Sequence, residues 1–260
     1  PVRASINNIE VVLKKRVKNI SRFSGLSYQD LLDQESRPVP QSLRESTETY
    51  LGSEPLSVDR YLSREYHEQE KRQLWPKVWQ SLCRETEISS AGDFYVHDVA
   101  GYSIAVVRTE RGDIHAYPNA CLHRGRQLKS GSSAGLGKSR DITCPFHGFR
   151  WSLDGSFQGA PCEWDFPHID RSNFDLPALR VDTWGGWVFV NIDGTAPPLR
   201  EYLGIMVDHF ERWAPEKTYK APHIKKVLRC NWKIANEAVI ESYHTAATQP
   251  QLLPYTGAAP

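Results

Sequence analysis

Short runs in which apolar and polar residues alternate dominate the middle of the chain. The runs read DFYVHDV, YSIAVVRT, DIHAYPN, FRWSLDG and WVFVNID and fall between residues 93 and 193. Glycine and aspartate punctuate them, and this spacing is typical of short strands joined by tight turns. The pattern predicts a small antiparallel β domain over residues 80–195.

Helix-like patterns precede this region. Residues 1–79 form a polar segment with helical character, in which residues 11–20 (VVLKKRVKNI) predict a short basic amphipathic helix. Such a helix can contact a membrane, but packing on its own domain or on a neighbouring subunit is the commoner use. Residues 60–79 predict a charged helix that turns Tyr66, Leu74 and Trp79 toward a core and stops near Pro76.

A second region begins after the β domain. The proline pair at 197 and 198 separates the two, and residues 199–213 (LREYLGIMVDHFERW) then predict a helix. The chain therefore divides into an N-terminal helical segment at 1–79, the β domain at 80–195 and the start of another domain at 196–260. The fold class expected from this order is α+β.

Composition limits the kinds of partner. The chain has 260 residues, of which 40% are hydrophobic and 24% charged, so it can bury a full core. The net charge of +1 gives no reason to expect a nucleic-acid partner, and we expect none. Apolar runs of about 18 residues are absent, so we expect no membrane span.

Two short hooks carry the chemistry. They read Cys121-Leu-His123 and Cys144-Pro-Phe-His147, and each pairs one thiolate with one imidazole. An asymmetric 2Fe-2S cluster of the Rieske type needs two cysteines on one iron and two histidines on the other. The alternative is a structural zinc site, but zinc fingers usually keep the two cysteines in one hook and the two histidines on a helix.

Glycine follows each hook, at Gly125 and Gly148, where the backbone has to turn tightly around a cluster. Unrelated core cysteines and surface histidines would not explain this repetition. The five cysteines leave Cys83, Cys162 and Cys230 outside the hooks. An odd remainder indicates free thiols in a reducing compartment, so we expect the protein in the cytoplasm.

Residues 61–249 resemble the alpha subunit of a Rieske-type, ring-hydroxylating non-haem iron oxygenase. Four blocks in the family's order carry the resemblance, namely CLHRGRQL at 121–128, CPFHGFRWSLDGSF at 144–157, WGGWVFVNID at 184–193 and NWKIANEAVIESYHTAATQ at 231–249. The resemblance implies a Rieske domain followed by a catalytic domain of helices and a curved sheet. Only the beginning of that domain fits into residues 196–260, so we expect the polypeptide to continue.

The hook sequences also separate subtypes of Rieske protein. Respiratory-chain members carry an extra cysteine in each hook and a serine that donates to a cluster sulfide, and this chain has Arg126, Phe146 and Phe149 at the corresponding positions. Without the hydroxyl donor, the potential is expected near the low end of the Rieske range of roughly -150 to +300 mV. The stretch between the hooks slightly exceeds the family's usual length, and its glycines at 131, 135 and 137 suggest a flexible loop.

The resemblance also implies a mononuclear Fe(II) site with two histidines and one carboxylate. The family's first histidine corresponds to His244, in the block Glu241-Ser-Tyr-His244, which the family places on a helix. The second histidine corresponds to Gln249, whose neutral amide is a poorer Fe(II) ligand, so the site is expected to hold iron weakly or not at all. The third ligand would follow residue 260.

In that family an acidic residue links a cluster histidine to an iron histidine of the neighbouring subunit, and Glu241 is the matching position. The implied enzyme takes electrons from NADH through a ferredoxin or reductase and uses O2 to hydroxylate a small aromatic or other apolar substrate, as in aromatic hydrocarbon catabolism. The implied assembly is a homotrimer or an alpha-beta hexamer. The alternative, favoured by Gln249, is a non-catalytic electron-transfer or assembly subunit of such a complex.

Overall fold

The computed structural model describes residues 28–45, 54–130, 135–241 and 244–252. The chain divides into two compact units, one made of residues 55–235 and the other of residues 1–54 together with 236–260. The amphipathic helix expected at residues 11–20 lies outside the described residues. The domain limits expected at 79/80 and 195/196 stay predictions.

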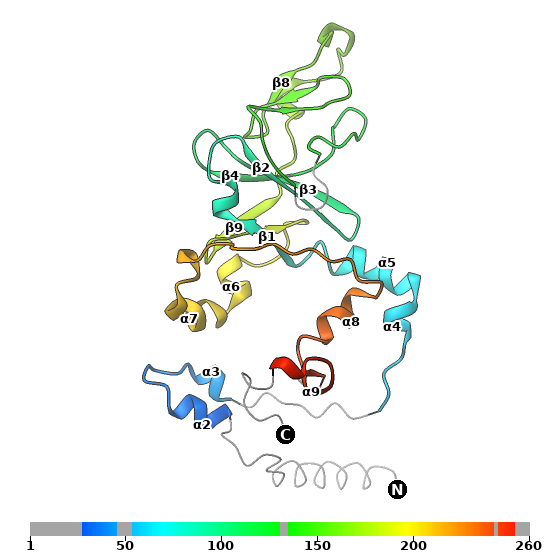
Figure 1. Cartoon of the computed structure of the whole chain (residues 1–260). Coiled ribbons are helices and arrows are strands. Elements are labelled where there is room, and N and C mark those ends of the chain that lie inside the picture. Colours follow the sequence, from blue (N-terminus) through cyan, green and yellow to red (C-terminus); the bar gives the residue numbers. More distant parts are fainter. Residues whose placement is uncertain (1–27, 46–53, 131–134, 242–243, 253–260) are drawn as a thin grey trace, which may run out of the picture. The chain divides into compact units, whose positions relative to one another are not determined.

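The β structure of the unit 55–235 consists of ten strands among the described residues, all paired antiparallel. The strands are β1 (Trp79–Arg84), β2 (Asp93–Val99), β3 (Tyr102–Arg108), β4 (Ile114–Pro118), β5 (Gly135–Lys138), β6 (Ile142–Thr143), β7 (Arg150–Trp151), β8 (Phe157–Gly159), β9 (Arg180–Trp184) and β10 (Trp187–Asn191). They form three sheets, with the orders β1-β10-β9, β4-β3-β2-β5 and β6-β7-β8 (Figure 1). The predicted antiparallel β domain is thereby confirmed.

Strand β3 shows how the sheets share a core. It is buried on both faces, with Val106 in one hydrophobic cluster and Val107 in the next, because successive side chains point to opposite sides of a strand. The cluster around Val106 includes Ile88, Val188 and other residues between the β1-β10-β9 sheet and the four-stranded sheet. The cluster around Val107 extends to the small sheet and to the loops that carry the cysteine and histidine hooks.

The flexible loop predicted around glycines 131, 135 and 137 is wrong for residues 135–138, whereas residues 131–134 lie outside the described residues. Residues 135–138 form β5, which pairs with β2 at the edge of the four-stranded sheet. Glycine at 137 is required for packing, because a Cβ atom there would lie 2.2 Å from the ring of Phe94. The absent side chain lets the aromatic ring close over the edge strand.

The helices are shorter than the sequence pattern indicated. They are α2 (Tyr28–Asp33), α3 (Gln41–Arg44), α4 (Asp59–Leu62), α5 (Arg64–Gln73), α6 (Leu199–Leu203), α7 (Met206–Phe210), α8 (Trp232–Glu237) and α9 (Thr245–Thr248). Single 3-10 turns occur at η1 (Glu85–Ile88), η2 (Glu163–Asp165), η3 (Arg171–Asn173), η4 (Glu211–Trp213), η5 (Pro215–Lys217) and η6 (Pro250–Leu252).

The helix expected over residues 60–79 is interrupted and ends early. Ser63 has extended backbone and caps α5 by accepting a hydrogen bond from the Tyr66 amide, so α4 and α5 are separate. Trp79 is buried as expected, but it begins strand β1, and Tyr66 is exposed. The sequence around Trp79 is compatible with a helix or with a strand, and pairing within the sheet decides for the strand.

The helix expected over residues 199–213 breaks at Gly204. This residue has a φ of +53°, a left-handed conformation that ends α6 before α7 begins. Across the part of the chain that the structure describes, no helix combines the length and apolar character needed to cross a bilayer.

Candidate metal centre

The two hooks fold into loops with the same backbone hydrogen bonds. In the first, the Cys121 amide donates to the carbonyl of Arg126 at 2.8 Å. In the second, the Cys144 amide donates to the carbonyl of Phe149, also at 2.8 Å. The donor and acceptor are five residues apart in both cases, so each loop returns to a cysteine whose backbone is held in place.

The glycines expected to turn the loops do so. The Gly125 amide donates to the Cys121 carbonyl at 2.8 Å, and the Gly148 amide donates to the Cys144 carbonyl at 3.1 Å. Their φ angles are +69° and +73°, a region that residues with a Cβ atom rarely adopt. The repetition of one loop geometry therefore has a sequence cause in both hooks.

Cysteines and histidines differ in depth. The side chains of Cys121 and Cys144 belong to a buried hydrophobic cluster, with exposed fractions of 3% and 2%. The ring of His123 is partly exposed and that of His147 is exposed, and their centroids lie 5.0 Å apart. If these four residues hold a cluster, the two thiols would bind it from the interior and the two imidazoles from the surface side.

Burial also sets the protonation of the free ligands. It raises the pKa of the Cys121 thiol, and the neighbouring Cys144 thiol adds to the increase. Burial lowers the pKa of the His123 imidazole, and the nearby His147 contributes in the same direction. Both shifts favour the neutral forms of Cys121 and His123, so iron binding at Cys121 has to displace the thiol proton.

Aromatic side chains close the interior side of the loops. The ring of Phe149 is buried and stacks on His123, with centroids 4.5 Å apart and planes inclined by 10°. Behind it lies Trp151, whose indole N–H donates to the Phe174 carbonyl at 2.8 Å. Because that hydrogen bond satisfies the indole, Trp151 is a core residue that supports Phe149.

The buried hydroxyl in this region was not predicted from the sequence. Tyr117 lies in the same cluster as the cysteines and donates to the Leu153 carbonyl at 3.0 Å. Its oxygen also lies 3.1 Å from Nδ1 of His115. The hydrogen-bond partner Leu153 is 36 residues away, so no local sequence pattern marks this contact.

The donor set fits the ligands that a 2Fe-2S cluster needs. In the described residues, no three or more side chains of histidine, cysteine, aspartate or glutamate gather as ligands of one ion. A Rieske cluster needs only two protein ligands on each iron, because sulfides bridge the two irons. Two thiols together in the interior and two imidazoles together near the surface match that requirement.

Of the residues expected at or beside the mononuclear iron site, His244 and Glu241 are in contact. Nδ1 of His244 lies 2.5 Å from a carboxylate oxygen of Glu241, and the His244 amide donates to the other oxygen at 3.4 Å. Neither residue is inside a helix, contrary to expectation: α8 ends at Glu237, and His244 is the N-cap of α9. Gln249 is the C-cap of that four-residue helix.

These residues do not complete a two-histidine, one-carboxylate iron site. Within the described range 236–241 and 244–252, His244 is the one imidazole, and the position of the second histidine holds an amide. The acidic residue beside it, Glu241, is the one expected to link to a cluster histidine. The described residues therefore bring together the four cluster donors, but only one imidazole and one carboxylate of the ligands expected for Fe(II).

Comparison with known proteins agrees with the loop geometry. Residues 78–170 match the family described as the Rieske 2Fe-2S domain. The chain is 32% identical over 197 residues to the biphenyl 2,3-dioxygenase subunit alpha of Rhodococcus jostii (strain RHA1), covering 74% of this chain and 42% of that protein. It is 27% identical over 232 residues to a glycine betaine monooxygenase oxygenase subunit of Pseudomonas aeruginosa, covering 88% and 52%.

Solved structures give the same result. The quaternary ammonium Rieske monooxygenase CntA in complex with L-carnitine superimposes with a TM-score of 0.70 at 26% identity, over 77% of this chain and 56% of that one. Naphthalene 1,2-dioxygenase with indole bound in the active site superimposes with a TM-score of 0.66 at 26% identity, over 75% and 44%. The chain spans about half the length of the relatives it matches.

Proposed function

We propose a function on the premise that the chain carries a Rieske 2Fe-2S domain and is related to the alpha subunits of Rieske oxygenases. The proposal is that this chain is an oxygenase component that accepts single electrons and passes them to oxygen chemistry. The observation that carries it is the pair of matching loops with buried thiols and outward imidazoles at Cys121, His123, Cys144 and His147.

Each ligand has a distinct task in this proposal. When bound, the cluster supplies a site that stores one electron. Cys121 and Cys144 would hold one iron from the aromatic interior, where burial excludes water. His123 and His147 would hold the other, and their imidazoles are accessible to a redox partner. Phe149 fixes the ring plane of His123 by stacking on it.

The reaction that we propose is hydroxylation of a small molecule with O2 and electrons from NADH, delivered by a ferredoxin or reductase in the cytoplasm. Two substrate classes are favoured by the relatives. One is aromatic, as in the names biphenyl and chlorobenzene dioxygenase, and the other is a quaternary ammonium compound, as in glycine betaine and carnitine monooxygenase. The proposed assembly is a homotrimer or an alpha-beta hexamer.

A second candidate function follows from Gln249. With an amide in place of the second histidine, the chain can serve as an electron-transfer or assembly subunit that needs no mononuclear iron of its own. The contact between Glu241 and His244 favours the enzyme, since a subunit without iron chemistry has no need for that pair.

Metal analysis of the purified full-length protein separates the two candidates. We expect two irons and two sulfides per chain from the cluster, and a third iron if the enzyme proposal holds. Oxygen uptake is then measured with NADH, a ferredoxin-reductase pair, and either biphenyl or carnitine as substrate. A third iron with substrate-dependent uptake supports the enzyme, whereas two irons with electron acceptance but no uptake support the subunit. One zinc per chain and a colourless protein contradict both.

A further inference from the structure

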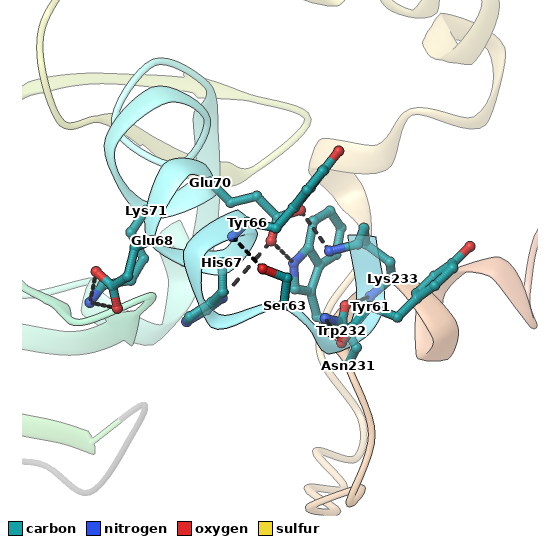
Figure 2. A network of polar contacts seen from close by, with 10 residues as sticks. All are labelled: Tyr61, Ser63, Tyr66, His67, Glu68, Glu70, Lys71, Asn231, Trp232 and Lys233. Carbon is teal, nitrogen blue, oxygen red and sulfur yellow. Dashed lines mark hydrogen bonds and ion pairs between the residues drawn. The ribbon is translucent and has the colours of Figure 1, made fainter. Parts of the chain in front are cut away.

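The structure contains a buried ion pair that neither the cluster nor the proposed iron ligands use. Nζ of Lys233 lies 2.6 Å from a carboxylate oxygen of Glu70, and both residues are buried, with exposed fractions of 6% and 8%. The two are 163 positions apart in the sequence. Figure 2 shows them joined between helix α5 and the start of helix α8. Both residues belong to the unit 55–235.

The surroundings of the pair are built to hold the charges. The Lys233 ammonium faces three aromatic rings, with 5.3 Å to the centroid of Tyr66, 5.9 Å to Tyr61 and 5.2 Å to Trp232. The second oxygen of Glu70 accepts the indole N–H of Trp232 at 3.3 Å. Removing water from two charges is costly, so a pair in this position persists only when such contacts replace hydration.

Asn231 strengthens the same junction. Its side-chain amide donates to the Tyr61 carbonyl at 3.0 Å, and its side-chain oxygen accepts the Lys233 amide at 3.0 Å. One residue thus caps the first turn of α8 and ties that turn to the N-terminal helices. The consecutive residues Asn231, Trp232 and Lys233 all contact the segment 61–70 (Figure 2).

Helix α5 is in turn fixed to the Rieske domain. The hydroxyl of Tyr102, at the start of β3, donates to the Lys71 carbonyl at 3.0 Å. Just after the helix, the side-chain amide of Gln80 in β1 donates to the Trp75 carbonyl at 3.1 Å. Direct contacts therefore run from the β domain through α5 to the first turn of α8.

We infer that Glu70 and Lys233 are positioning residues, which form a latch that holds the start of α8 in register with the Rieske domain. Helix α8 continues along the chain toward Glu241 and His244, so the latch holds the residues that precede that segment. The inference rests on the proposed function for its consequence, which is faster electron flow out of the reduced cluster.

The test uses the full-length protein with the variants Glu70→Gln, Lys233→Met and the two combined. The double variant keeps an amide oxygen for the indole of Trp232 but buries no charge. Glu68→Gln is the matched control, since Glu68 pairs with Lys71 at 3.1 Å on the same helix but on its exposed side. Amide hydrogen exchange of residues 232–241 and the substrate-dependent reoxidation rate of the reduced cluster are measured well below the unfolding temperature.

Each single substitution leaves one buried charge without its partner. We therefore expect the protection of the α8 amides against hydrogen exchange to fall roughly 100-fold. Reoxidation of the cluster is expected to slow about tenfold while the cluster spectrum stays unchanged. A misplacement of reacting groups by about 1 Å can reduce a rate by that factor or more. The double variant should recover most of the protection because no unpaired charge remains. Glu68→Gln should stay within about twofold of the wild type.

Two results would overturn the latch. One is equal protection in Glu70→Gln and Glu68→Gln, and the other is lost protection with an unchanged reoxidation rate, which identifies a merely structural pair. If the wild-type cluster is not reoxidised with any substrate, the proposed function fails, and hydrogen exchange alone then decides whether the latch exists.

Discussion

The cluster loops and the segment from Glu241 to Leu252 both present ligand-type side chains, but they differ in completeness. The loops repeat one hydrogen-bond pattern around four donors of the two required kinds. The segment holds one imidazole at His244, one carboxylate at Glu241 and an amide at Gln249. Under the proposed function, the loops would hold the group that stores an electron, and use of that electron on oxygen would depend on the segment from Glu241 to Leu252.

The difference in burial predicts that the two regions tolerate substitution differently. The loop cysteines lie in a packed aromatic interior, where a substitution alters both ligation and core. His244 and Glu241 are about one-third exposed, and α9 is a single turn of four residues. A ligand can be replaced there at little cost in folding free energy, so loss or restoration of iron binding is decided mainly by ligand chemistry.

The largest expected effect is on the cluster itself. Replacing Cys121 or Cys144 with serine should abolish it, because a hydroxyl does not substitute for a thiolate on iron in this ligand set. Iron and sulfide content and the electron paramagnetic resonance signal of the reduced protein measure the loss. The exposed thiol Cys162 provides the control, and Cys162→Ser should keep the cluster. A cluster that survives Cys121→Ser would show that the ligands lie elsewhere.

The next effect concerns the segment from Glu241 to Leu252. In the full-length protein, Gln249→His should raise mononuclear iron occupancy and substrate-dependent oxygen uptake, with the Rieske spectrum unchanged. An imidazole binds Fe(II) better than an amide, and supporting contacts around a ligand change metal affinity by roughly 10 to 100-fold. Iron content under limiting Fe(II) and oxygen consumption are the measurements.

Gln251→His is the matched control for this substitution, since it adds the same imidazole two residues further on, at an exposed position. It should leave iron content unchanged. Equal iron content in the wild type and in Gln249→His would mean that the site lacks more than one ligand. The electron-transfer or assembly function would then be the better account.

The two regions also differ in how far the sequence predicted them. The hooks were predicted because cysteine, histidine and glycine recur at fixed short spacings, and local hydrogen bonds alone shape each loop. The strand runs at 93–99 and 102–108 were likewise visible as alternation. The pair of Glu70 and Lys233 left no such signal: Glu70 sits in a run of charged residues, and its partner is 163 positions away.

The predicted limits of helices and strands were wrong where the effect of a single residue outweighed a periodic pattern. Gly204 splits the expected helix at 199–213 through its left-handed backbone, and Ser63 splits the expected helix at 60–79 by capping α5. Glycines at 131, 135 and 137 predict a flexible loop, whereas residues 135–138 form an edge strand in which the ring of Phe94 packs where a Cβ atom of residue 137 would lie. Each failure is a tertiary or capping effect that periodicity does not contain.

A smaller effect tests how the interior side of the loops sets the redox potential. Phe149→Ser should raise the potential by roughly 40 mV, since one hydrogen bond of about 1 kcal/mol to a cluster sulfide stabilises the reduced form. The buried Trp151 limits the room for the hydroxyl to turn. Phe149→Leu is the control that removes the ring without adding a donor. A wild-type potential near the positive end of the Rieske range would contradict the argument.

The smallest effect concerns the turn between β7 and β8. The hydroxyl of Ser152 and the amide of Ser156 donate to Asp154 and lower the pKa of its carboxyl to about 2. Because this folded-state pKa lies below the ordinary value of 3.8, the stabilisation is complete above about pH 4 and is lost as pH falls toward 2. Asp154→Ala should therefore lower the free energy of unfolding at pH 7, by less than about 1 kcal/mol because the carboxylate is exposed. Denaturation midpoints of the wild type and Asp154→Ala at pH 7 and pH 3 check the sign. The difference between the two midpoints should be smaller at pH 3, and a larger difference there would refute the stabilising role of the Asp154 carboxylate.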